Sequence, residues 1–522
     1  MAVDHERLNG EDLSAGVPSA LSPWWRTVLA GLAVIFAVAG LFVFARGLDN
    51  GLVSDDWVFL DQAFRAAGPA GMLSASSFGS SHFVRPIQSL ITWSLFWTFG
   101  VVPLPYHLAS LLLHLVNSAL LYLLARRLAI LVGVAKNLVV WASAGAGLLF
   151  FLNWHHHEAV YWFSAINEPL STLLRLLTLL TALQWLGRSP WRAGLYSLSL
   201  VSMCLALFAK ESAVAVPLEI LLLAWLARRY RPGTWTVGKT LLALVPFGLI
   251  VMIWLGFYLS APGVASGVVI QRSGLQVMQA SPIEWLLRSL QYFDAHYLGG
   301  TLLGQNITLL ALEALILTLL TALAVRRNQY LWVFALAWTL CAALPDVAVV
   351  PEEVSRLHLP ILAVGVFGDR YLYYSSAGAS LTLIASLLWI GQEVQGGARR
   401  AWINLAWAAA TALVTLTLGL NLDRLAVEEA DWGVAGRLGT ALVQQAVQGM
   451  SGKNGMLCVA NLPDNYRGKY VFRNGIGGAL DLADPQARYS IRVLPGADSK
   501  LPNQACTFFV DGNQIAQSLV NR

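Results

Sequence analysis

A succession of long apolar runs is the feature that most constrains this chain. A transmembrane helix needs about 20 consecutive, mostly apolar residues, and its backbone groups must be satisfied within the segment because lipid offers no partners. Hydrophobic residues make up 57% of the 522 residues and charged residues only 12%, about half the charged share of soluble domains. The sequence therefore predicts an α-helical polytopic membrane protein with the lipid bilayer as its solvent.

Apolar runs of spanning or nearly spanning length recur along most of the chain. We predict about eleven transmembrane helices, at residues 24–45, 106–125, 138–153, 169–187, 192–209, 212–228, 239–259, 304–325, 330–346, 373–393 and 402–421. The preceding segment, residues 1–23, is polar and lacks the apolar core and cleavage site of a signal peptide. We therefore expect a transmembrane domain over residues 24–421, preceded by a short tail.

Basic clusters between these helices predict the orientation. They contain Arg126 and Arg127, Arg188 and Arg192, Arg228 and Arg229, Arg326 and Arg327, and Arg399 and Arg400. All fall on one side of the membrane, which the positive-inside rule makes cytoplasmic, together with the N-terminus. Topology thus accounts for the net charge of +5 without nucleic acid as a partner. The scarcity of additional domains favours the bacterial cell (inner) membrane.

The predicted non-cytoplasmic side carries three long loops, at about residues 46–105, 260–303 and 347–372. Two apolar stretches within them, Ile87–Phe99 and Pro282–Leu298, are too short to span. We expect both to form helices that lie in the membrane interface. The loops also gather acidic, histidine and single arginine residues, which predicts a polar chamber at the outer membrane face.

Residues 422–522 predict a small domain outside the membrane, of α/β or mostly β structure. Strand-like stretches occur at residues 456–463, 470–476, 488–494 and 507–510. Cys458 and Cys506 both fall in this segment, where an oxidising compartment would allow them to form a disulfide.

An acidic pair, Asp55 and Asp56, follows the first predicted helix, between Ser54 and Trp57. One interpretation is a helix N-cap, because Ser and Asp favour that position. The other is a functional carboxylate pair, which acts as a base or binds a divalent metal ion. The sequence around the pair leaves both open.

A second candidate lies at residues 153–168, which link two helices on the outer side. His155 and Glu158 are three residues apart and share one helix face. Metal binding is one interpretation, although Tyr161 stands where a zinc-binding HExxH motif needs its second histidine. An interfacial polar cap with aromatic residues is the alternative.

Cationic residues recur where helices meet the outer face. Lys210 precedes Glu211 at the end of one predicted helix, and Arg370 opens another. Both could anchor the helix ends at the interface, or they could hold a phosphate at headgroup depth. Further charges lie inside predicted helices, at Arg175, Glu219 and Glu313; such charges are functional candidates or one another's buried partners.

In their order along the chain these motifs resemble the GT-C superfamily of polyprenyl-phosphate-sugar-dependent glycosyltransferases. The motifs are SDDW (54–57), HFVRPIQSL (82–90), the helix from Tyr106 to Leu128, NWHHHEAVYW (153–162), AKES (209–212) and DRYLYYSSAG (369–378). The similarity covers most of residues 24–421 and is greatest to the protein O-mannosyltransferase branch, glycosyltransferase family 39, and to TMTC-type membrane regions. In this chain Trp154-His155 replaces the usual His-Pro, and Asn167-Glu168 replaces the common Arg-Asp.

The resemblance implies a role for each motif. Asp55 and Asp56 occupy the position of the acidic residue that acts as general base or helps to bind a metal. Lys210, Arg370, Tyr371 and Tyr373 match the motifs that contact the lipid phosphate. The site-framing residues are His82, Arg85, His155, His157, Glu158 and Glu211, and a divalent metal ion would bind at Asp55 and Asp56 or at His155 and Glu158.

The chemistry of such a reaction fits these residue types independently. Transfer from a lipid phosphate sugar needs a base for the proton of the acceptor hydroxyl and cations for the departing phosphate. We therefore expect an inverting, mannosyltransferase-like enzyme that uses a polyprenyl-phosphate sugar as donor and a protein, lipid or glycan as acceptor. The alternatives are a transporter or flippase of lipid-linked sugars, and a non-catalytic scaffold of the same fold.

Overall fold

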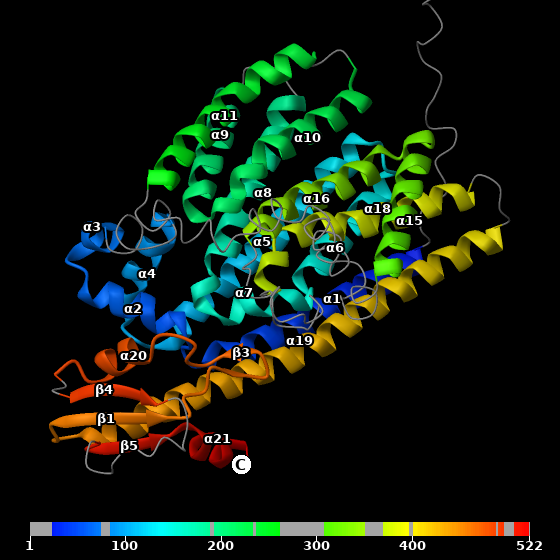
Figure 1. The fold of residues 1–522 in the computed structure, drawn as a ribbon. Helices are drawn as coiled ribbons and strands as arrows, with labels where there is room; N and C mark the ends of the chain where they lie inside the picture. Colours follow the sequence, from blue (N-terminus) through cyan, green and yellow to red (C-terminus); the bar gives the residue numbers. More distant parts are fainter. Residues whose placement is uncertain are drawn as a thin grey trace, which may run out of the picture.

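The computed structural model describes residues 23–74, 84–187, 193–232, 236–260, 307–349, 369–395, 400–486, 489–494 and 506–520. Most of these residues form helices that pack side by side (Figure 1). The apolar part contains Pro23–Arg46 (α1), Pro103–Leu131 (α5), Lys136–Phe151 (α6), Asn167–Gly187 (α8), Ala193–Ala209 (α9), Val216–Tyr230 (α10), Val237–Ser260 (α11), Ile307–Arg326 (α15), Tyr330–Val349 (α16), Ser375–Gln395 (α18) and Arg400–Met450 (α19).

Every one of the eleven predicted apolar segments is helical in the structure. Among the described residues, five helices are long and apolar enough to cross a membrane, or six if the bent pair Lys136–Phe151 and Trp154–Tyr161 forms one span. Exposed apolar side chains cover α11, from Leu242 to Phe257. An apolar surface of this extent suits lipid rather than water. The chain is therefore mostly helical with several membrane-compatible helices, and the number of crossings stays a prediction.

Shorter helices gather at one end of the bundle (Figure 1). They are Asp55–Arg65 (α2), Gly68–Leu73 (α3) and Pro86–Phe99 (α4), together with Trp154–His156 (η3), His157–Tyr161 (α7), Phe163–Ala165 (η4), Glu211–Ala215 (η5) and Asp369–Leu372 (η7). The helix α4 confirms the helical prediction for Ile87–Phe99, and Pro86 is its first residue. The other predicted interfacial helix, Pro282–Leu298, lies outside the described residues.

The helix α19 runs along the bundle beside α1 and continues into the C-terminal domain (Figure 1). It has 51 residues, so the predicted domain boundary at 421–422 falls inside a helix. No proline interrupts residues 422–450, and strong helix formers such as Ala, Leu, Glu and Gln are frequent there. The membrane helix and its extension are therefore one continuous element.

A small α/β domain follows α19. Its strands are Gly455–Ala460 (β1), Asn465–Tyr466 (β2), Lys469–Tyr470 (β3), Tyr489–Leu494 (β4) and Phe508–Asp511 (β5), and its helices are Ile476–Ala483 (α20) and Gly512–Val520 (α21). The order β4-β1-β5 is parallel, and β2 pairs with β3 as an antiparallel hairpin. Cys458 and Cys506 form a disulfide, as the sequence allows.

One predicted strand is wrong. Residues 470–476 leave the β conformation after Tyr470, because their backbone groups bond elsewhere. The amide of Val471 donates to the carbonyl of Asp464 over 3.0 Å, and the carbonyl of Val471 accepts from the amide of Ser54 over 2.8 Å. The segment is therefore tied to the residue that precedes α2, not to a sheet.

Candidate functional site

The acidic pair lies in the first turn of α2, and its two carboxylates have different surroundings. Asp56 is fully buried and accepts three hydrogen bonds, from the amide of Val53 (3.0 Å), the amide of Ser164 (2.7 Å) and the hydroxyl of Ser164 (2.6 Å). Asp55 is partly exposed and accepts one, from the Asn474 side chain over 2.7 Å. Asp56 thus joins α2 to η4, while Asp55 keeps access to solvent.

The helix-cap interpretation of this pair holds in part. The helix α2 begins at Asp55, but Ser54 makes no side-chain cap bond and has a φ of 48°. Asp56 instead accepts a hydrogen bond from the amide of Val53, just before the helix. A carboxylate at a helix N-terminus also interacts favourably with the helix dipole. Burial raises the pKa of Asp56 to about 7, although the hydrogen bonds from Ser164 and Val53 favour its ionised form.

A second group, the Arg370 cluster, consists of Glu158, Trp162, Arg370, Tyr371 and Tyr470. Arg370 forms an ion pair with Glu158 and donates its backbone amide to the same carboxylate over 3.0 Å. Its guanidinium carbon lies 4.9 Å from the ring centroid of Trp162 and 4.6 Å from that of Tyr371. Burial opposes its charge, but Glu158 raises the pKa of Arg370 well above its usual value. Arg370 is therefore a permanent cation in an aromatic setting.

The histidines of residues 155–157 do not act as one group. Nδ1 of His155 lies 2.8 Å and Nε2 of His157 2.9 Å from the two carboxylate oxygens of Asp369. The Trp432 indole donates to Nδ1 of His157 over 2.8 Å, so Nε2 carries the proton that His157 donates to Asp369. His156 instead faces Ser376 of α18, over 2.7 Å. Although burial opposes it, His155 and His157 lower the pKa of Asp369 below its usual value.

The predicted pair of His155 and Glu158 is divided between two partners. His155 bonds Asp369, whereas Glu158 bonds the adjacent residue Arg370. Within the described part of the chain, no group of three or more His, Cys, Asp or Glu residues is arranged to hold a metal ion. A metal at either predicted position stays a prediction.

Lys210 lies in a third group, the Lys210 cluster, with Glu168 and Asp346. Its ammonium nitrogen is 2.6 Å from Glu168 Oε1 and 2.8 Å from Asp346 Oδ1, and the side chain is only 1% exposed. The nitrogen also lies 4.9 Å from the ring centroid of Tyr371. Tyr371 therefore contacts both predicted phosphate-binding cations.

Two further predicted residues form an ion pair on the edge of the Lys210 cluster. Arg85 donates to Glu211 from Nε over 3.0 Å and from Nη2 over 2.5 Å. Burial opposes ionisation of Glu211, but Arg85 lowers its pKa below the usual value. The pair joins the residue before α4 to η5, so both residues frame the same end of the bundle.

Tyr373 and His82 complete the predicted set. Tyr373 is fully buried within the helices, and its hydroxyl bonds His114 over 2.8 Å and Asn117 over 3.2 Å. It therefore faces the bundle interior, while Tyr371 faces the cations. His82 lies outside the described residues, as do Glu352, Glu353, Arg356 and His358 of the third outer loop.

Short contacts bring the acidic pair and the Arg370 cluster together. Asp56 bonds Ser164, which is two residues from Trp162 beneath Arg370. From the other side, Asn474 bonds Asp55, and Tyr470, four residues earlier, contacts Trp162 with ring centroids 4.8 Å apart. Four residues span at most about 14 Å. Two series of contacts therefore connect the acidic pair with Arg370, one through Ser164 and Trp162 and the other through Asn474 and Tyr470.

Several residues of this site were not predicted from sequence. Asp369 appears in the DRYL motif, Glu168 beside Asn167 and Trp162 at the end of the NWHHHEAVYW motif, but none of them had a predicted role in the site; Asp346, Tyr470 and Asn474 carried no functional signal. The charged residues inside the predicted helices gave a partial signal. Arg175 pairs with Glu219 over 2.5 Å inside the bundle, and mutual pairing was one of the two interpretations that the sequence allowed for these residues.

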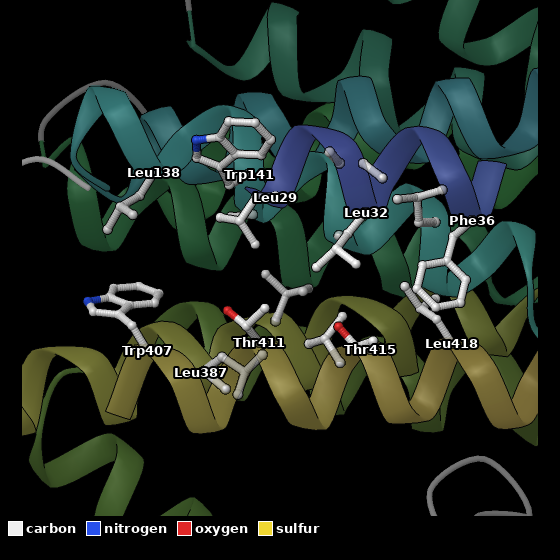
Figure 2. Close-up of a pocket in the computed structure, with 18 of the residues that line it drawn as sticks. Leu29, Leu32, Phe36, Leu138, Trp141, Leu387, Trp407, Thr411, Thr415 and Leu418 are labelled. Atoms are coloured by element: carbon white, nitrogen blue, oxygen red, sulfur yellow. The ribbon is translucent and has the colours of Figure 1, made fainter. Parts of the chain in front are cut away.

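A separate cavity of about 130 Å³ lies among α1, α6, α18 and α19 (Figure 2). Its lining is apolar apart from the hydroxyls of Thr411 and Thr415, and includes Leu29, Leu32 and Phe36 of α1. These residues lie at least ten positions before the end of α1 at Arg46, whereas Asp55 and Asp56 follow that end. The cavity offers no group that could act on a substrate.

Comparisons with known proteins give limited similarity. No family model matches the chain, and no curated protein matches it. The similar solved structures include two of ArnT from Cupriavidus metallidurans. In the apo state it has 16% identity and a TM-score of 0.44, and bound to undecaprenyl phosphate it has 15% identity and a TM-score of 0.42; each alignment covers 93% of this chain and 90% of the other. We therefore derive the function from this chain's own residues.

Proposed function

We propose that this protein is a membrane glycosyltransferase that moves a sugar from a polyprenyl-phosphate donor to an acceptor hydroxyl on the non-cytoplasmic face. The observation that carries the proposal is the series of contacts that connects Asp55 with Arg370 through Trp162, Ser164 and residues 470–474. A partly exposed carboxylate and a permanent cation are the two groups that this reaction needs.

In this proposal Asp55 is the general base. It takes the proton of the acceptor hydroxyl, whose oxygen attacks the anomeric carbon of the donor sugar while the bond to the phosphate oxygen breaks. The lipid phosphate leaves with the electron pair of that bond, and the configuration inverts. Asp56 is less suited to this step, because its three hydrogen bonds hold it inside the protein.

Arg370 is the cation that contacts the phosphate in this proposal. Its planar guanidinium can donate two parallel hydrogen bonds to phosphate oxygens, and its side chain is 19% exposed. Lys210 has a different part, because two carboxylates already surround its ammonium group. It supports the position of Tyr371 beside Arg370. The transferred sugar stays a prediction, with a mannosyl donor as the expectation. The acceptor class, a protein, a lipid or a glycan, also stays a prediction.

Replacing Asp55 by Asn tests the proposal in membranes supplied with radiolabelled polyprenyl-phosphate sugars. We expect transfer to fall by about 10²–10⁴-fold, the usual contribution of a general base. Asp61→Asn is the matched control, since Asp61 lies on the same helix and bonds only the exposed Arg65 among the described residues. Full activity in Asp55→Asn would remove Asp55 as the base. Lipid-phosphate binding without transfer by the unaltered protein would favour a flippase or scaffold instead.

A further inference from the structure

Among the described residues, a short segment of the C-terminal domain, residues 469–475, contacts the candidate site. Lys469 forms an ion pair with Glu428 of α19, and both side chains are only 4% exposed. Val471 bonds the backbone of Ser54 just before α2. Asn474 then bonds Asp55. The segment is therefore fixed at three points along the edge of the site.

A glycine ends this segment where its backbone packs against Ser54. Gly475 has a φ of +87°, and a Cβ at this position would lie 2.4 Å from the carbonyl oxygen of Ser54. Gly478, in α20, similarly lies against Trp57, where a Cβ would be 2.8 Å from its carbonyl oxygen. Only glycine allows this backbone contact. The glycine-rich stretch thus seats the C-terminal domain directly on α2.

Tyr470 is the residue of this segment that enters the Arg370 cluster. Its ring packs on Trp162 with the ring centroids 4.8 Å apart, and the Arg370 guanidinium lies over the same indole at 4.9 Å. A guanidinium group only donates, so Arg370 does not need the O–H proton of Tyr470, which remains to be donated. Burial and the nearby Glu158 carboxylate raise the pKa of Tyr470, which keeps that proton in place at neutral pH.

The Arg370 cluster has more hydrogen-bond donors than acceptors. The indole N–H of Trp162 is buried and has no partner among the described residues. Three donor side chains of the cluster, Trp162, Arg370 and Tyr470, thus accompany one carboxylate, that of Glu158. A ligand with several acceptor oxygens and a negative charge would use this surplus.

We propose that the C-terminal domain completes the donor site, and that the Tyr470 hydroxyl binds the lipid phosphate beside Arg370. This inference rests on the proposed function, since the phosphate is that of the polyprenyl donor. It assigns the domain a direct part in substrate binding. Asn474 acts in the same segment as a positioning residue, because it touches Asp55 rather than the ligand.

Tyr470→Phe tests this inference in the purified full-length protein, with undecaprenyl phosphate as the probe. The substitution keeps the ring on Trp162 and removes only the hydroxyl. We expect about tenfold weaker binding, the scale of one hydrogen bond to a charged group. Binding of undecaprenol, which has the same chain without the phosphate, should not change. Tyr466→Phe is the matched control, because Tyr466 lies on the same hairpin with its ring over Arg467.

Arg370→Gln separates failure of this inference from failure of the proposed function. If Arg370→Gln weakens binding of undecaprenyl phosphate and Tyr470→Phe does not, the hydroxyl contact is wrong and the lipid-phosphate site stands. If Tyr470→Phe weakens binding of both probes equally, its effect is structural and the contact is also wrong. If the unaltered protein binds neither probe, both proposals fail.

Discussion

Lys210 and Arg370 both contact the ring of Tyr371, at 4.9 and 4.6 Å, but their surroundings differ. Lys210 is 1% exposed and lies between two carboxylates, Glu168 and Asp346. Arg370 is 19% exposed, has one carboxylate partner, and shares its cluster with unused donors. Two cations that look equivalent in the sequence therefore differ in their surroundings. The Lys210 cluster is a closed group, whose cation is already surrounded by carboxylates, and the Arg370 cluster is an open group, which can still bind a ligand.

The largest expected effect comes from removing the cation of the Lys210 cluster. Lys210→Met keeps a chain of similar length but leaves Glu168 and Asp346 as two buried carboxylates without a cation. Breaking a buried ion pair in this way costs about 3–5 kcal/mol in the free energy of unfolding. Denaturation of the purified protein in detergent measures the loss.

A compensated variant checks the cause of this loss. Adding Glu168→Gln and Asp346→Asn to Lys210→Met removes the unpaired charges, and most of the stability should return, because neutral replacement of a buried ion pair is often tolerated. The distinction between the Lys210 and Arg370 clusters is wrong if Lys210→Met is as stable as the unaltered protein and instead loses binding of undecaprenyl phosphate. Lys210 would then be a phosphate ligand.

Asp369, the residue before Arg370, bonds His155 and His157, and its contribution to stability should depend on pH. Its pKa is lower in the folded protein than in the unfolded chain. The stability that it contributes is therefore present above its unfolded pKa, about 3.9, and is lost as the pH falls through the lower folded value. We expect Asp369→Asn to cost about 1.5–3 kcal/mol at pH 7, as for hydrogen bonds to a charged group.

The difference between Asp369→Asn and the unaltered protein should shrink as the pH falls below about 4. Unfolding curves measured from pH 7 to pH 3 would show this convergence. Asp423→Asn is a control on α19, because Asp423 has no ion pair among the described residues. A difference that stays constant over this range would show that Asp369 acts through packing and not through its charge.

Sequence patterns predicted the parts of this molecule that depend on neighbouring residues. Each predicted transmembrane segment coincides with a helix, and α4 followed the same local logic. The partners of the charged residues depend on contacts between distant parts of the chain. Lys210 and Asp346 are 136 residues apart, and Asp55 and Asn474 are 419 residues apart. Periodicity carries no information about such pairs.

The prediction for residues 470–476 failed for the same reason. Their composition favours a strand, yet their backbone bonds Ser54, which precedes α2. Likewise, the sequence predicts one side of the membrane for both Asp55 and Asp56 but could not tell them apart. Burial of Asp56 against Ser164 separates them, and burial is a property of the assembled fold.

The smallest expected effect comes from a substitution in the Arg370 cluster that keeps its positive charge. Arg370→Lys keeps a cation against Glu158 but loses the planar fork that binds two phosphate oxygens at once. We expect about tenfold weaker binding of undecaprenyl phosphate, equivalent to about 1.4 kcal/mol, with thermal stability close to that of the unaltered protein. Arg65→Lys is the control, since Arg65 pairs with Asp61 and Asp481 and is 59% exposed. Unchanged affinity in Arg370→Lys would mean that a point charge suffices, so the ligand would contact Arg370 through one oxygen. A large loss of stability would instead place Arg370 with Lys210 among the structural cations, and the difference between the two groups would disappear.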